Sequence, residues 1–484
     1  MDVARPDRSP RSLREAWLAL TGLSAVFLFE MLDNSILNVA LPTIGRELGA
    51  SLSVLQWITA SYSVTFGGLM LVFGALSDRV GRRRIMLAGL VLLGVASLAT
   101  ATVATPAELL AVRAVMGVAA AMTTPGSMAL AFRLFAEDSL RVRAMTLIST
   151  VGLIGLAVGP TAGGFVLAIA PWQTLLLVNV PVATLAFAGI AVGIAPDDRA
   201  DLHPHPVDIT GAALGTATIV LALVAPSAFV QIGAGSWEPW AAVAAAGCAA
   251  VGFVLRERSA AFPLLDLALL SHPLVSSGLA FRSAAGLATA GLGYLVTLQL
   301  QLQWGWTPAQ AALGLLPQVV VLLAGGALIR PLMDRIGLER AAWLSSSAVV
   351  AGLAVFAALG RQGYAWVAGA LALVAAGMRV VGVVAGTNVL RGLPPSRTTI
   401  GAALVDTASE VTSGAGVALA GTILAALVTG TLVREQSDVQ EAATFGNAVT
   451  VAAVALTVAA GALVATGILR SRRGTTARDP EPAD

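Results

Sequence analysis

Four carboxylates lie inside long apolar stretches of the sequence, where a charged side chain is costly unless it faces a cavity or a partner. They are Glu30, Asp33, Asp406 and Glu410. Asp406 and Glu410 are four residues apart and would share one face of a helix. A carboxylate that binds either a proton or a cation exchanges one for the other. The set predicts coupling between protons and a substrate, and the alternative for each residue is a structural hydrogen bond to a neighbouring helix.

Three arginines, Arg113, Arg282 and Arg379, also fall within apolar stretches and join the coupling candidates. Arg379 is too far from a helix end to extend its charge easily to the membrane surface. Two interpretations of it remain open. Arg379 neutralises Asp406 or Glu410, which leaves a single carboxylate to alternate between proton and substrate. Otherwise Arg379 holds an anionic group of the substrate, which argues against a purely cationic cargo.

A short segment rich in glycine and arginine, residues 74–84, follows the second apolar stretch. Its glycines allow a tight turn, its aspartate can accept hydrogen bonds from an arginine, and its arginines suit anionic headgroups. The key residues are Gly74, Asp78, Arg79, Gly81 and Arg82. Asp334 and Arg335 repeat the central pair much later in the chain. This weak internal repeat predicts two similar halves around a central site, which is a plan typical of transporters.

A second glycine pattern lies in the apolar stretch at 144–169. It comprises Gly152, Gly155, Gly159, Pro160, Gly163 and Gly164. Gly155, Gly159 and Gly163 are spaced by four residues, so they form a flat stripe on one helix face where another backbone can approach closely. Pro160 bends the helix. The alternative is ordinary packing of small residues.

The elements that position these residues must be membrane-spanning helices. Of the 484 residues, 57% are hydrophobic and 12% charged, and the mean hydropathy is +0.84, whereas soluble chains carry about 25% charged residues. Segments crossing lipid must be helical unless they form a closed barrel. Apolar runs predict fourteen spans, at residues 17–40, 54–76, 85–104, 107–131, 144–169, 173–195, 209–231, 237–255, 273–302, 308–332, 341–360, 364–390, 400–432 and 446–469.

The orientation follows from the arginines, which make up all of the 29 basic residues. With the N-terminus in the cytoplasm, most of them fall in cytoplasmic connections and tails. The outer connections hold only Arg46, Arg361 and Arg434. This bias predicts that both termini are cytoplasmic. One cysteine, Cys248, excludes intrachain disulfides and cysteine metal clusters.

These motifs resemble the major facilitator superfamily over nearly the whole chain. Segment 74–84 resembles its signature loop, which acts there as a conformational latch between two halves. The glycine stripe is similar to its antiporter motif, a feature of exporters. Residues 32–42 resemble the first-helix signature of the fourteen-helix drug:proton antiporters. Arg113 matches an element thought to take part in proton transfer, although Met116 stands where the family often has Gln.

The stretch 401–421 narrows the resemblance to the branch that exports quaternary ammonium compounds and antibiotics, although that branch usually has Glu in place of Asp406. The resemblance implies an all-α integral membrane protein with the major facilitator fold. We expect one six-helix bundle in residues 1–200, two additional helices in 201–272, and a second bundle with a cytoplasmic tail in 273–484.

The implied function is proton-coupled export of amphipathic drugs or antibiotics across the cytoplasmic membrane of a bacterium, by a monomer that needs no cofactor, metal or nucleic acid. Export of one endogenous metabolite, anionic or zwitterionic, is the main alternative. Nutrient uptake is disfavoured by the antiporter motif. A membrane-bound enzyme is disfavoured because no nucleophile constellation or phosphate loop is visible, and the same absence argues against ATP as the energy source.

Overall fold

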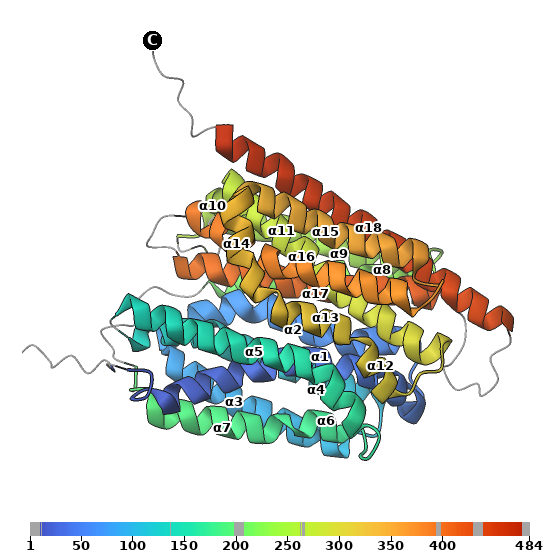
Figure 1. Cartoon of the computed structure of the whole chain (residues 1–484), viewed down its shortest axis with the longest axis horizontal. Helices are drawn as coiled ribbons and strands as arrows, with labels where there is room; N and C mark the ends of the chain where they lie inside the picture. The colour runs from blue at the N-terminus through green and yellow to red at the C-terminus, as the bar shows by residue number, and fades with distance from the viewer. Residues whose placement is uncertain are drawn as a thin grey trace, which may run out of the picture.

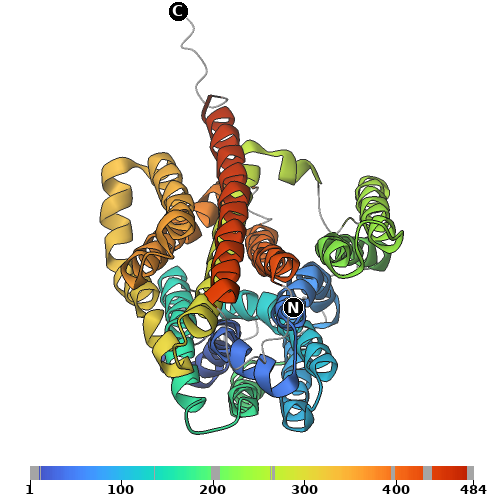
Figure 2. The same ribbon diagram turned by 90° about the vertical axis from the view of Figure 1, so that its right-hand side faces the viewer.

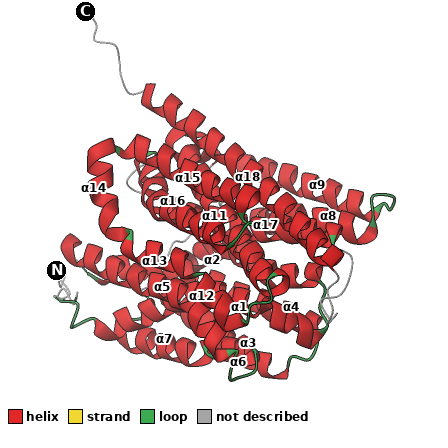
Figure 3. Cartoon of the chain, turned by 45° about the vertical axis from the view of Figure 1, so that its right-hand side comes forward, coloured by secondary structure: helices red, strands yellow, loops and turns green. Residues whose placement is uncertain are grey.

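The structure is a computed structural model that describes residues 10, 12–135, 137–197, 208–261, 263, 267–393, 398–428 and 439–476. Every regular element in this part of the chain is a helix (Figure 3). Most of the helices are long, and they run roughly side by side along the longest dimension of the molecule (Figure 1). This arrangement confirms the all-α prediction.

The helices up to residue 193 form the first packing group, the N-terminal group. Its members are α1 (Trp17–Leu48), α2 (Leu52–Val80), α3 (Arg82–Ala99, extended by the 3-10 turn Thr100–Thr102), α4 (Pro106–Leu134), α5 (Asp138–Val166), α6 (Gln173–Leu177) and α7 (Asn179–Gly193). Helix α1 packs against α5 and α7, whereas α4 packs against α2 and α3.

Local sequence signals fix the boundaries of these helices. Thr105 caps α4 in a capping box with Glu108, and a proline at the first position suits a helix start. Gly81 separates α2 from α3 with φ of 120°, a backbone conformation that side chains rarely adopt. Gly81 is therefore needed for the turn that the sequence predicts in segment 74–84.

Helices α8 (Ile209–Ile232) and α9 (Glu238–Ser259) form a hairpin at the edge of the molecule, seen in green in Figure 2. Asp208 caps α8 and accepts a hydrogen bond from Arg256 at 2.8 Å, which holds the pKa of the Asp208 carboxyl below its usual range. The hairpin packs on the rest of the protein mainly through α8, which contacts α2 and α17.

The remaining helices form the C-terminal group, reached through the short helix α10 (Leu267–Ser271). Its members are α11 (Pro273–Leu298, extended by the π-helix Gln299–Gln303), α12 (Pro308–Gly314), α13 (Leu316–Ala324), α14 (Gly326–Ile336), α15 (Leu338–Leu359), α16 (Tyr364–Arg391), α17 (Thr398–Leu427) and α18 (Val439–Thr476). Helix α11 lies at its centre, against α16, α17 and α18.

Twelve helices of the described chain are long and apolar enough to cross a membrane, and α2 is a thirteenth if its two parts, bent by 49°, count as one span. The expected span at 308–332 is the one that differs. Its apolar part ends at Ala324, and α14 continues after a break at Gly325. Two features of the sequence disfavour one continuous helix here: Pro317 lacks a backbone N–H, and the successive glycines Gly325 and Gly326 have low helix propensity. The prediction from apolar length alone did not take them into account.

The two groups contact each other along α2 and α17, where Gly67 lies against Val411, and also at the end that holds the α1–α2 turn. There the amide of Gln301 donates to the backbone carbonyl of Val39 at 2.8 Å, and Gly164 of α5 lies against α12. The amide of Gln56 donates to Ser227 and Thr422 at 3.1 and 3.0 Å, which joins α2, α8 and α17. At the opposite end α14 packs on α13, α15 and α16, all within the C-terminal group.

Candidate binding cavity and buried charges

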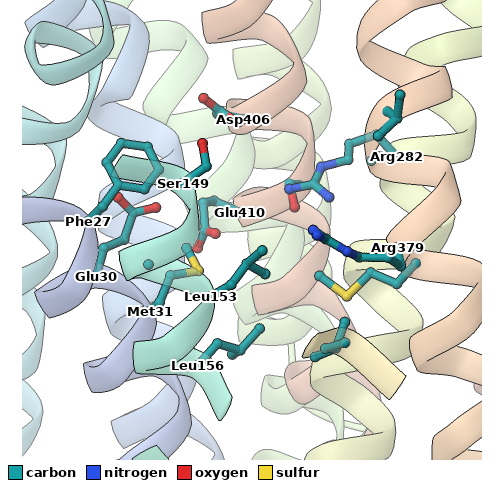
Figure 4. Close-up of a pocket in the computed structure, with 16 residues that line it drawn as sticks. Phe27, Glu30, Met31, Ser149, Leu153, Leu156, Arg282, Arg379, Asp406 and Glu410 are labelled. Carbon is teal, nitrogen blue, oxygen red and sulfur yellow. The ribbon is translucent and has the colours of Figure 1, made fainter. Parts of the chain in front are cut away.

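A cavity of about 290 Å³ lies between the two packing groups. Helices α1 and α5 line it from the N-terminal group, and α11, α13, α16 and α17 line it from the C-terminal group. Five of the seven predicted coupling residues reach it: Glu30, Arg282, Arg379, Asp406 and Glu410 (Figure 4). Apolar side chains such as Phe27, Met31, Leu153 and Leu156 supply much of the remaining wall. A mostly apolar pocket with a few convergent charges is the usual form of a small-molecule site.

The three cavity carboxylates come from both packing groups. Glu30 of α1 is 5% exposed and accepts a hydrogen bond from the hydroxyl of Thr124 at 2.9 Å. Asp406 and Glu410 come from α17, one turn apart, as their spacing predicts. Glu410 is also buried, and one of its oxygens has no hydrogen-bond partner in the described structure. The set therefore retains unused capacity to bind a proton or a cation.

The two cavity arginines face these acids without touching them. Neither Arg282 nor Arg379 forms an ion pair within 4.0 Å with any described residue, and the Nε atom of each is buried without a hydrogen-bond partner. It is the charge of Arg282 that acts on Glu30, Asp406 and Glu410 over a longer distance. Arg379 lies instead against the glycine pair between α13 and α14, where a β-carbon on Gly326 would come within 2.7 Å of its guanidinium.

Asp33 and Arg113 form a separate buried cluster inside the N-terminal group. Their side chains are joined by an ion pair of 2.5 Å and are 0% and 1% exposed. The amide of Asn179 donates to the second oxygen of Asp33 at 3.0 Å, and the ring of Tyr62 lies 4.5 Å from the Arg113 guanidinium. The structure thus divides the predicted coupling residues between this cluster and the cavity.

Tyr62 is a residue that the sequence did not single out. Its side chain is fully buried, and its hydroxyl has no hydrogen-bond partner among the described residues. The residue is near enough to Asp33 and Arg113 of the buried cluster, and to Glu30 and Glu410 of the cavity, to interact electrostatically with all four. Tyr62 is therefore a candidate link between the buried cluster and the cavity. A tyrosine within a span gives no sequence signal that separates it from an ordinary core residue.

Comparison with known proteins places this geometry in a family. Residues 23–417 match the Major Facilitator Superfamily. The chain belongs to the Major Facilitator Superfamily. The chain is 33% identical over 389 residues to the cephamycin export protein CmcT of Amycolatopsis lactamdurans, covering 79% of this chain and 75% of that one. It is 31% identical over 434 residues to the multidrug efflux pump LfrA of Mycolicibacterium smegmatis, covering 86% and 82%.

A third relative is the methyl viologen resistance protein SmvA of Salmonella typhimurium, 29% identical over 415 residues, covering 84% of this chain and 82% of that one. Among solved structures, an inward-facing, occupied bacterial homolog of the human lysosomal transporter Spinster matches with a TM-score of 0.67. The match covers 98% of this chain and 100% of that one at 14% identity. This last likeness supports the major facilitator fold alone.

The glycine stripe of this superfamily member lies in the contact between α5 and α1. A β-carbon on Gly155 would lie 2.9 Å from the backbone carbonyl of Leu28, and Gly159 lies directly against Ser35. Gly163 meets Ile36, and Gly152 reaches the cavity wall beside Phe27. The predicted close approach of two backbones is confirmed, while the role of the stripe in antiport stays a prediction.

The predicted latch segment is held within the N-terminal group of this superfamily member. Asp78 accepts a hydrogen bond from Arg82 at 2.8 Å, and the guanidinium of Arg83 donates to the carbonyl of Ala191 at 2.7 Å. Asp197, beyond α7, accepts from the backbone N–H groups that start α3. Gly74 and Arg79 flank this network, and Asp334 and Arg335 are exposed on α14. No described ion pair joins the two motifs.

Proposed function

We propose that this superfamily member exports amphipathic drugs or antibiotics across the cytoplasmic membrane of a bacterium in exchange for protons. The observation that carries the proposal is the cavity between the two packing groups, with apolar walls and three carboxylates that make no ion pair within the described chain. Relatives of similar length are named for cephamycin export, multidrug efflux and methyl viologen resistance. These names support export as the direction of transport.

The carboxylates support exchange because protonation and cargo binding compete for the same oxygens. Glu30 accepts a hydrogen bond from Thr124 and Glu410 accepts one from Ser63, but the second oxygen of Glu410 is buried without a partner in the described structure. A cationic group that enters the cavity therefore meets Glu410 and Asp406 as its available partners. A proton that binds Glu410 removes this attraction and releases the cargo. Proton entry from the outside thereby drives the release of cargo.

Alternating access follows from the contacts between the two packing groups, which we propose as the two moving bundles. Besides the contact of α2 with α17, they meet at the end that holds Gln301 and Gly164. With the N-terminus in the cytoplasm, as the arginine distribution predicts, this is the outer end, and the cavity opens inward. The latch segment, bonded within its own group, corresponds to that inward-open state. The protein would act as a monomer, since one chain contains the whole cavity.

Efflux of ethidium from a pump-deficient bacterium tests the proposal. Cells that express the wild type should accumulate less ethidium, and an uncoupler should abolish the difference. Undiminished export in de-energised inverted vesicles supplied with ATP would contradict proton coupling.

The role of the cavity acids is tested by Glu410→Gln, which removes the negative charge from the oxygen that lacks a partner. Proton-driven ethidium export in inverted vesicles should fall to the rate of vesicles without the protein. Glu47→Gln is the matched control, because Glu47 is exposed at the end of α1 and far from the cavity. Export that survives Glu410→Gln as well as it survives Glu47→Gln would remove this residue from the coupling site.

A further inference from the structure

The arginines of the cavity are not explained by export of a simple cation. Arg282 comes from α11 and Arg379 from α16, and both side chains extend toward the same space (Figure 4). A cationic cargo would be repelled by both. The third arginine within a span, Arg113, has a carboxylate at 2.5 Å, so a buried arginine of this protein can be paired within the chain.

We propose that Arg282 and Arg379 form a subsite for an anionic group of the cargo, and that the cargo is a zwitterionic amphiphile. Its cationic group would lie toward Asp406, Glu410 and Glu30. This inference rests on the proposed export function and names the substrate class.

The geometry favours a ligand with two or more acceptor oxygens. The two guanidinium groups belong to different helices, and neither forms an ion pair within 4.0 Å in the described structure. Each also has an Nε that lacks a hydrogen-bond partner, as Arg113 does, so it is the missing ion pair that distinguishes the two cavity arginines. A guanidinium binds a carboxylate or phosphate through parallel hydrogen bonds, which a lysine cannot do. An unpaired charge in the membrane interior is costly, so a cavity ligand is the partner that remains.

Of the two arginines, Arg379 is the stronger evidence for an anion subsite. Arg282 acts electrostatically on the three cavity acids and so has a second role as their counter-charge. Arg379 instead packs against Gly326 at the break between α13 and α14. The absence of a side chain on Gly326 leaves room for the guanidinium in its observed position, since with a β-carbon there the guanidinium would have to shift.

The charge balance favours a zwitterion over an anion. Three carboxylates and two arginines line the same cavity, so a purely anionic cargo would face more negative than positive groups. A purely cationic cargo would leave both arginines without a partner. A zwitterion can place its anionic group at the arginines and its cationic group at the carboxylates. Its apolar body would then lie against Phe27, Met31 and Leu153.

The test uses two dyes that differ in one group. Rhodamine 110 is a zwitterion with a free carboxylate, and rhodamine 123 is its methyl ester, a cation on the same ring system. Binding to the purified protein is measured by fluorescence anisotropy. Arg379→Gln should weaken rhodamine 110 binding by about tenfold, the loss expected for a hydrogen bond between charged groups. Rhodamine 123 binding should be equal or tighter, because a repelling charge is removed. Arg282→Gln should weaken rhodamine 110 and leave rhodamine 123 equal or tighter.

Arg391→Gln is the matched control, because Arg391 is exposed at the end of the same helix and is not part of the cavity wall. It should change neither dye. Arg379→Lys keeps the charge but loses the paired donors, so it should weaken rhodamine 110 alone, by less than Arg379→Gln. If Arg379→Gln cannot be purified as a monodisperse protein, the comparison of the two dyes on Arg379→Lys tests the inference in its place.

Equal effects on both dyes in a monodisperse variant of Arg379, or no effect on either, would overturn the inference. So would a wild type that binds rhodamine 123 and not rhodamine 110. These outcomes leave the proposed function intact, because the ester reports cationic cargo separately. A wild type that binds neither dye and exports no ethidium would overturn the proposed function together with the inference.

Discussion

At the residue scale, the cavity and the buried cluster show that charge in a span has two distinct uses. Asp33 and Arg113 are bonded to each other and surrounded by protein, whereas the cavity acids and arginines form no ion pair with any described residue. Removing one member of a buried pair costs about 3–5 kcal/mol, because the other charge remains buried alone. Asp33 and Arg113 therefore stabilise the N-terminal group whatever part they play in proton transfer.

Tyr62 offers a test of whether the buried cluster and the cavity exchange protons. Tyr62→Phe keeps the ring over Arg113 and removes only the hydroxyl, which has no hydrogen-bond partner in the described structure. We expect a protein of nearly unchanged unfolding temperature and unchanged dye binding. Proton-driven ethidium export should slow by about tenfold or more, as expected for the loss of a proton-transfer group. Unchanged export would mean that the hydroxyl has only a packing role.

The charged residues of the cavity could be predicted from the sequence, and their neighbours could not. Glu30, Arg282, Arg379, Asp406 and Glu410 are charged residues in apolar stretches, and that property alone identifies them. Thr124, Asn179 and Tyr62 are uncharged, and such residues are common within spans. Their importance depends on which helices are adjacent. The separation of Asp33 from the cavity also depends on packing, since Asp33 and Glu30 are only three residues apart in the sequence.

At the scale of the helices, the contact between α5 and α1 depends on the absence of side chains along the glycine stripe. Gly159→Leu should abolish export, because a large side chain would meet Ser35 and force the two helices apart. The measurement is ethidium efflux together with the amount of protein in the membrane. Gly386→Ala is the control, since nothing lies near a β-carbon at that position of α16. Gly386→Ala should keep full export, and its free energy of unfolding should rise by about 0.5–1 kcal/mol because alanine favours the helix. Wild-type efflux from Gly159→Leu would contradict close packing at this contact.

The positions of the helices were predicted well because hydropathy and charge bias report directly on the membrane. The break in the tenth predicted span was not, although Pro317 and Gly325 are visible in the sequence. Apolar length does not distinguish a straight helix from an interrupted one. The same limit applies to the contact made by Gln56, Ser227 and Thr422, which links the α8–α9 hairpin to both packing groups through three unremarkable polar residues.

At the scale of the whole molecule, the latch segment forms no ion pair with the C-terminal group in the described part of the chain. Asp78→Asn removes the negative charge of the group that accepts the hydrogen bond from Arg82. We expect a folded protein with unchanged dye affinity, since the segment lies at the end of α2 and away from the cavity wall. Export should become slower, because the loop can no longer favour one state over the other. The export rate and the Kd for the dye are measured on the same vesicles. A normal export rate would mean that the segment only sets the orientation of the protein in the membrane.

The two arginines that face three carboxylates also bear on the energetics of the cycle. A zwitterionic cargo has no net charge, so exchange for one proton would carry one positive charge into the cell. Such a cycle is electrogenic. Moving one elementary charge across the membrane is worth about 2.3 kcal/mol per 100 mV. The membrane voltage would therefore drive export even where the pH is equal on both sides.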